Sequence, residues 1–177
     1  QLDSGDYHRL IASAADYLVD RFDAEVVFVP LERDNDVRHS HGVVGQMRHA
    51  PRATVLKRPY TPGQIVTLLG HFEFTLGMRL HFLVFSALAG VPFLGLPYSE
   101  KVAAFLDEFG LCTPPLELTT AGQLIAAVDR AWEQRDALKG RMGATLERLQ
   151  ERARLNDQLL QRLLGAQRAE ASEARPG

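Results

Sequence analysis

Short apolar runs that alternate with helical patterns constrain the fold of this chain more than any other feature of its sequence. Four such runs have the length and the β-branched or aromatic content of buried strands, at 24–30, 53–57, 73–77 and 92–96. Segments whose apolar residues recur at three- and four-residue steps separate these runs and are typical of helices. Because parallel strands are joined through helices, the alternation predicts an α/β fold with a doubly wound parallel sheet.

A predicted helix precedes the first of these strands, with Asp3 or Ser4 as its candidate N-cap. The other helices expected between and after the strands cover about 37–48, 62–72, 79–90 and 100–110. Parallel α/β domains usually open on a strand that becomes central, whereas this sequence opens on a helix. We therefore expect a sheet that lacks its first strand, in a chain that is a fragment of a longer protein.

Only helices are predicted beyond residue 119. Thr119 or Thr120 caps the first of them, and the second carries a stripe with alternating steps of four and three residues. The stripe consists of Met142, Leu146, Leu149, Ala153, Asn156, Leu160 and Leu163. Because a heptad-like stripe is a helix-packing surface, we expect it to be buried against the missing N-terminal half of the protein or against a second copy.

These patterns divide the chain into three parts. A Rossmann-like domain is predicted at 1–137 and an amphipathic helix at 138–165. The remaining segment, 166–177, has small and polar residues and is predicted to be a disordered tail.

Composition excludes some partners. Lys and Arg number 20 and Asp and Glu number 22, so the chain lacks the basic excess that binding to nucleic acid requires. The single cysteine, Cys112, cannot form an internal disulfide, which favours a reducing compartment, and we expect a cytoplasmic protein. The apolar stretch 80–98 has nearly the length of a membrane span, but Gly90 and Pro92 divide it, and it is interpreted as helix, turn and strand.

Charged and hydroxyl side chains follow the third and fourth predicted strands. Arg79 and His81 come after 73–77, while Tyr98, Ser99 and Lys101 come after 92–96. Ligands of doubly wound sheets bind beyond the carboxyl ends of the strands, where helix N-termini present free N–H groups. These positions therefore predict a site for a small carboxylate or phosphate.

A structural role remains open for each of these side chains. Arg79 would then pair with an acid such as Glu73, and Lys101 would lie in solvent. The "DND" sequence at 34–36 is interpreted as a solvated helix cap. No metal site is expected, because helical geometry turns His39 and His41 to different faces, and no cofactor is expected, because dinucleotide and phosphate-loop motifs are missing.

The stretch "GMRLHFLVFSALAGVPFLGLPYSEKVAAFL" at 77–106 resembles the signature of the polysaccharide pyruvyl transferase family. It has the Gly-Met-Arg-Leu-His turn, a helix that ends in Ala-Gly-Val-Pro, and a Tyr-x-x-Lys-Val segment. The resemblance implies the C-terminal half of a two-domain, GT-B-like enzyme. Such enzymes transfer a pyruvyl group from phosphoenolpyruvate to two hydroxyls of a cell-wall or exopolysaccharide sugar, leaving a cyclic ketal.

The resemblance also implies roles for individual residues. His81 and Lys101 are expected to be catalytic, and Arg79 is expected to bind substrate together with Tyr98 and Ser99. The family often has Asp in place of Ser99 and at position 73, so details of these loops differ. A glycan or lipid-linked sugar would be the acceptor, and a chain without the N-terminal half would be inactive alone. Two alternatives remain open, which are half of a nucleotide-sugar glycosyltransferase and a non-catalytic assembly module with this fold.

Overall fold

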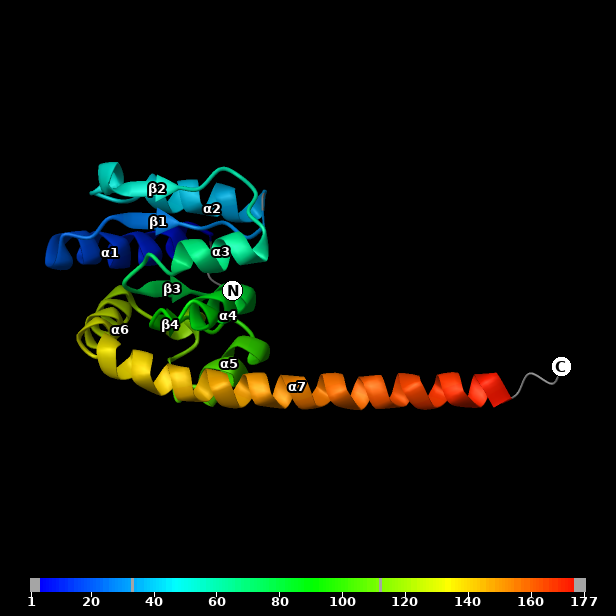
Figure 1. The fold of residues 1–177 in the computed structure, drawn as a ribbon. Coiled ribbons are helices and arrows are strands. Elements are labelled where there is room, and N and C mark those ends of the chain that lie inside the picture. The colour runs from blue at the N-terminus through cyan, green and yellow to red at the C-terminus, as the bar shows by residue number, and fades with distance from the viewer. Residues whose placement is uncertain (1–3, 33, 112, 174–177) are drawn as a thin grey trace.

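The computed structural model describes residues 4–32, 34–111 and 113–173 (Figure 1). The fold is mixed α/β and mostly helical, and these residues include four strands of three residues each. The strands are β1 (Val26–Phe28), β2 (Ala53–Val55), β3 (Thr75–Gly77) and β4 (Phe93–Gly95). Each strand lies inside one of the four apolar runs that predicted it. Cys112 and the candidate cap Asp3 lie outside the described residues.

The strands form two separate parallel pairs instead of one doubly wound sheet. β1 pairs with β2 and β3 pairs with β4, in the registers Val26↔Ala53 and Thr75↔Phe93. In Figure 1, β1 and β3 are the two facing strands, and no ladder joins them in the part of the chain that the structure describes. The parallel orientation within each pair was predicted correctly. A single continuous sheet is not formed.

Seven α-helices are found among the described residues. They are α1 (Ser4–Phe22), α2 (Asn35–Val44), α3 (Pro62–Leu69), α4 (Leu80–Leu88), α5 (Glu100–Glu108), α6 (Ala121–Glu133) and α7 (Arg135–Glu173). Thr61 and Thr120 begin α3 and α6 with capping boxes, in which each threonine accepts a hydrogen bond from a backbone N–H three residues later. Local sequence therefore specifies where these two helices start.

Helix α1 packs against both strand pairs. Its residues Ala12 and Ala15 share a buried cluster with Val43 and Met47, beside β1 and β2. Its residues Leu10 and Ala14 belong to a second cluster, on the side of β4 and α6. That second cluster also contains Leu94, Leu96, Leu116, Leu124 and Val128. Since the two pairs share no ladder, α1 is a principal connection between them.

Glycines end both strands of the second pair. Gly77 and Gly95 are register partners, and α4 and α5 fold back directly over them. A Cβ built at Gly77 would collide with the ring of Phe82, and one built at Gly95 would collide with Leu106, which is buried. Only glycine leaves room for this close approach of helix to strand.

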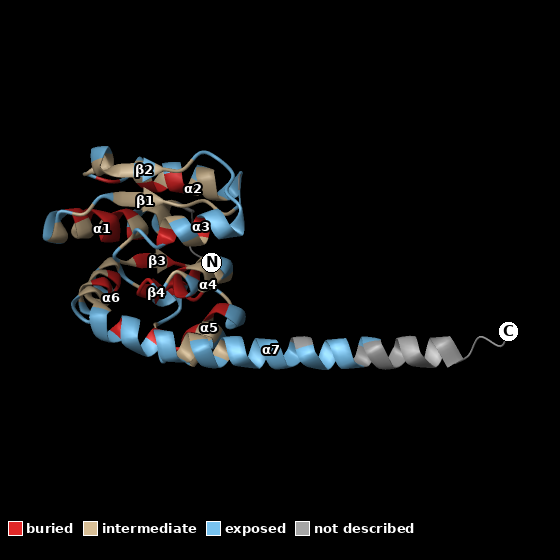
Figure 2. Cartoon of the chain, in the orientation of Figure 1, coloured by how far each residue is buried: buried red, intermediate tan, exposed pale blue. Residues whose placement is uncertain are grey.

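Helix α7 is buried only in its first part. Leu138 and Met142 are buried against α4 and α5, and Leu146 and Leu149 pack partly against the same cluster. Beyond Leu149 every described side chain is exposed, and the helix projects far from the body (Figure 2). The stripe was predicted to pack against a missing domain or a second copy. Its first half packs instead against α4 and α5 of the same chain, and its later described residues are exposed. The side chains at 157, 163 and 165–173 are not among those described.

The helical segment is longer than the sequence indicated. α7 begins at Arg135 and runs to Glu173, so it starts before 138 and includes most of the segment 166–177 that was predicted to be disordered. Ala, Arg, Gln and Glu dominate residues 166–173, and all four favour the helix. In the described residues no helix is long and apolar enough to cross a membrane.

We predict opposite effects for two glycine substitutions. Gly95→Ala should destabilise the protein by about 1–3 kcal/mol, because the new methyl group overpacks the β4–α5 contact. Gly140→Ala, in α7, should stabilise it by about 0.5–1 kcal/mol, because an added Cβ meets nothing within 4 Å and alanine favours the helix. Urea unfolding measures both, and an unchanged midpoint for Gly95→Ala would contradict the close packing.

Candidate active site

Helices α4 and α5 begin at the carboxyl ends of β3 and β4. Arg79 is the N-cap residue of α4 and Ser99 is that of α5, and neither side chain caps its helix. The N-cap side chains of both helices thus leave the first N–H groups uncapped, in contrast to the capping boxes of α3 and α6. Two such termini at one edge provide positive potential for an anion.

His81 is exposed in the first turn of α4. Its imidazole ring lies 6.5 Å from the ring of Phe85, measured between centroids, and forms no hydrogen bond or ion pair with any residue that the structure describes. The imidazole is thus accessible to a bound molecule.

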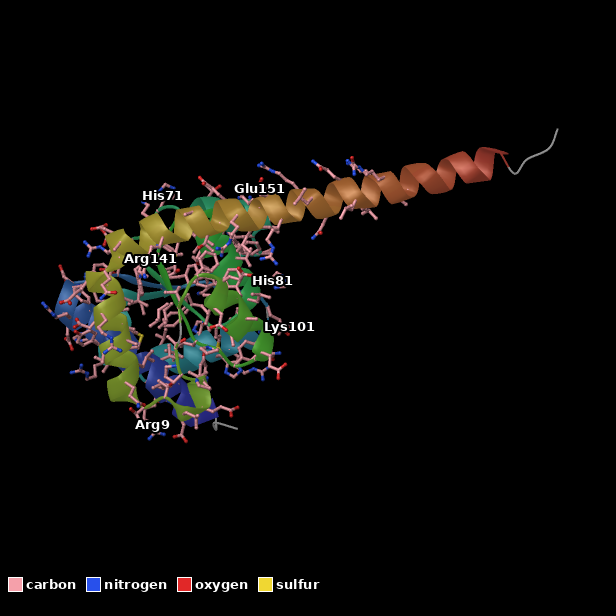
Figure 3. All side chains as sticks on the ribbon, turned by 90° about the horizontal axis from the view of Figure 1, so that it is seen from below. Arg9, His71, His81, Lys101, Arg141 and Glu151 are labelled. Carbon is pink, nitrogen blue, oxygen red and sulfur yellow. The ribbon has the colours of Figure 1, made fainter. Side chains whose placement is uncertain are left out.

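Lys101 lies in the first turn of α5 and is also exposed. Within the described ranges its ammonium group has no ion-pair partner. Figure 3 shows the Lys101 and His81 side chains on the same side of the body, away from His71 and Arg9. Tyr98 is 54% exposed and Ser99 is half-buried, just before α5. The structure therefore brings the predicted residues to one edge of the molecule.

Arg79 is held by two carboxylates that the sequence did not identify as its partners. Its Nε donates to Asp36 Oδ1 at 3.0 Å, and its Nη2 donates to Glu32 Oε2 at 2.7 Å. The hydrogen bond with Asp36 is the main reason why the pKa of the Arg79 guanidinium is raised. Glu73, the acid suggested by the sequence, is exposed and has no ion pair with Arg79.

Asp36 also orders the loop that follows β1. Its Oδ2 accepts hydrogen bonds from the backbone N–H groups of Leu31 and Glu32, at 3.0 and 2.9 Å. The Asp36 side chain is only 18% exposed, so the interpretation of 34–36 as a solvated cap is wrong for this residue. Ligands of parallel α/β sheets bind beyond the carboxyl ends of the strands. Applied to β1, this rule would also have predicted Asp36 at the same edge as Arg79.

Arg79 and His81 line one open cavity of about 300 Å³. The other lining residues are Leu31, Glu32, Tyr60, Pro62, Ile65 and Phe85. Tyr60 and Glu32 were not predicted to be near the site, and they come from the loops after β2 and β1. Lys101, Tyr98 and Ser99 do not line this cavity, so the edge contains a cavity and a separate exposed ammonium group.

A larger groove, of about 840 Å³, lies between α5 and α7. Glu108 lines it and pairs with Arg148 at 3.2 Å and with Arg152 at 2.9 Å. These hydrogen bonds, the one with Arg152 first, lower the pKa of Glu108. The pairing makes this groove a junction between α5 and α7, remote from the strand ends.

The two histidines of α2 lie in different surroundings. His39 Nδ1 lies 3.0 Å from His8 Nε2 of α1, whereas His41 is exposed, so the two histidines do face different ways. Among residues 4–32, 34–111 and 113–173, no three His, Cys, Asp or Glu side chains gather closely enough to hold a metal ion.

Comparison with known proteins identifies the family. The sequence model of the polysaccharide pyruvyl transferase family matches residues 1–100, which include both strand pairs and the turns that carry Arg79, His81, Tyr98 and Ser99. No curated protein and no solved structure matches the chain significantly. The family match covers more than half of the sequence, and the chain therefore belongs to the polysaccharide pyruvyl transferase family.

Proposed function

We propose that this chain takes part in transferring the pyruvyl group of phosphoenolpyruvate to a sugar of a cell-wall or exopolysaccharide glycan, where it forms a cyclic ketal. In this proposal the chain supplies the Rossmann-like half of a GT-B-like enzyme, and the glycan or lipid-linked acceptor also contacts another domain. The site at the ends of β3 and β4 binds the donor.

The main support is the position of two unpaired basic side chains at one edge. His81 and Lys101 lie in the first turns of adjacent helices, both are exposed, and neither forms an ion pair within the described part of the chain. Phosphoenolpyruvate carries a phosphate and a carboxylate, which suit an ammonium group and uncapped helix N-termini.

Arg79 is given a different role, because two carboxylates already offset its charge. Asp36 and Glu32 bind its Nε and Nη2, so the guanidinium adds little net positive potential to the cavity. Its Nη1 has no hydrogen-bond partner among the residues described. We assign Arg79 to orienting the substrate through Nη1, and Lys101 to attracting the anionic groups.

The reaction suits these groups. One sugar hydroxyl adds to C2 of phosphoenolpyruvate while C3 gains a proton, and a second hydroxyl then displaces phosphate to close the ketal. Two hydroxyl protons must leave and one proton must reach carbon. His81 is assigned to proton transfer because imidazole exchanges protons near neutral pH, and Lys101 is assigned to stabilising the departing phosphate.

Donor binding tests the Lys101 assignment. Calorimetric titration should show binding of phosphoenolpyruvate, and Lys101→Ala should weaken it at least ~10-fold because a charge-assisted contact is lost. Lys139→Ala is the matched control, since Lys139 is exposed on α7, outside the site. Binding of uridine diphosphate in place of phosphoenolpyruvate would contradict the proposal and support a nucleotide-sugar glycosyltransferase.

Turnover tests the His81 assignment. In the full-length enzyme, His81→Ala should lower the rate of ketal formation at least ~100-fold, which is typical for loss of an acid–base group. His71→Ala should leave it unchanged, because His71 is exposed on another side of the body (Figure 3). A folded His81→Ala enzyme with the parental rate would remove His81 from the mechanism.

A further inference from the structure

The cavity that Arg79 and His81 line has no excess of positive charge. Glu32 lines it as well, and Asp36 adds a second carboxylate to the Arg79 guanidinium. Even when His81 is protonated, these two cations are matched by the two carboxylates. Phosphoenolpyruvate carries a phosphate and a carboxylate, so the acidic groups oppose its binding in the cavity. The cavity is better suited to a ligand without charge.

The rest of the cavity wall is apolar or aromatic. It consists of Leu31, Tyr60, Pro62, Ile65 and Phe85. Small-molecule sites typically combine such a wall with a few polar groups that fix orientation, in volumes from about 300 Å³ upward. This cavity has a volume of about 300 Å³. A pyranose ring, with an apolar C–H face and a rim of hydroxyls, matches this division of the surface.

We infer that this cavity is the acceptor subsite, and that it binds one neutral pyranose ring of the glycan. The inference rests on the proposed function and deepens it, because it assigns donor and acceptor to different parts of one edge. Phosphoenolpyruvate binds on the side of Lys101, which does not line the cavity, and the sugar binds within the cavity.

Tyr60 is held in position by its neighbours in the sequence. Pro59 precedes it, and Thr61 and Pro62 follow it as the N-cap and first residue of α3. Each proline fixes its own φ and restricts the residue before it, and the capping box fixes the start of the helix. The tyrosine is nevertheless 36% exposed. An exposed ring on a stiff loop loses little conformational freedom on binding, so it is suited to stack on the face of a sugar.

Glu32 and Arg79 supply the polar groups. The Glu32 carboxylate accepts hydrogen bonds from Arg79 Nη2 at 2.7 Å and from Asn35 Nδ2 at 3.1 Å. A carboxylate has about four lone-pair sites, so two remain for other donors. Arg79 Nη1 has no hydrogen-bond partner in the part of the chain that the structure describes. Because a sugar hydroxyl both donates and accepts, neighbouring hydroxyls can bind Glu32 and Arg79 Nη1 together.

His81 is the group that both parts of the edge share. It lines the cavity, and its side chain is on the same side of the body as Lys101 (Figure 3). Transfer requires the acceptor hydroxyl and the donor to meet at the group that moves the proton. A sugar in the cavity brings its hydroxyls to His81 and leaves the Lys101 side to the donor.

Binding of simple sugars to the 177-residue chain tests the subsite. The probes are methyl β-glucopyranoside, methyl β-galactopyranoside and methyl α-mannopyranoside, titrated by saturation-transfer NMR. We expect at least one to bind, and Tyr60→Ala to raise its dissociation constant at least ~10-fold because the stacking surface is lost. Tyr60→Phe keeps the ring and should stay within ~2-fold of the parent.

Leu88→Ala is the matched control for the loss of an exposed apolar side chain. Leu88 is 44% exposed and ends α4, far along the helix from His81. This variant should bind the sugar like the parent chain. Failure of all three sugars to bind, or equal weakening by Tyr60→Phe and Tyr60→Ala, would overturn the inference.

Competition with phosphoenolpyruvate separates this inference from the proposed function. A saturating concentration of phosphoenolpyruvate should leave the sugar bound, and Tyr60→Ala should bind phosphoenolpyruvate like the parent chain. Displacement of the sugar by phosphoenolpyruvate would overturn the acceptor subsite and leave the donor proposal standing. A chain that binds the sugar but no phosphoenolpyruvate would contradict the donor proposal and leave the sugar site standing.

Kinetics of the full-length enzyme test the same assignment during turnover. Tyr60→Ala should raise the KM for the acceptor sugar at least ~10-fold and leave the KM for phosphoenolpyruvate within ~2-fold. A general loss of structure would not separate the two constants. An equal rise of both would therefore contradict a specific role of Tyr60 in binding the acceptor.

Discussion

Packing of α1 against both strand pairs is the interaction on which this architecture depends. Two-stranded sheets with three residues in each strand have few ladder hydrogen bonds and little stability of their own. α1 contributes Ala12 and Ala15 to one buried cluster and Leu10 and Ala14 to the other. The relative position of β1 and β3, and hence the edge at which their carboxyl ends meet, follows largely from this helix.

The pairing of Arg79 with Asp36 connects the same two halves at the site. It joins the first turn of α2 to the turn after β3, between two strand pairs that share no ladder in the described residues. Asp36 is mostly shielded from solvent, so the contact is better protected from salt than an exposed pair. It offsets the charge of Arg79, whereas His81 and Lys101 form no ion pair with any described residue.

The candidate site and the projecting helix lie in different parts of the chain. Residues 1–100 match the family model and contain the strands, the cavity and most of the candidate site, and Lys101 follows immediately. The projecting part of α7 lies beyond this match and shares no residue with the site.

Local sequence determined the strands, their parallel orientation and the starts of helices such as α6, because these depend on nearby residues. β4 lies in an apolar run, and Thr120 meets its partner Gln123 only three residues away. The strand-end rule also brought His81 and Lys101 to one edge. Only the tertiary structure decided that Asp36 binds Arg79 across 43 residues, that the strands form two pairs, and that α7 continues into solvent. Such contacts depend on how α1 places distant segments, and no local pattern contains that placement.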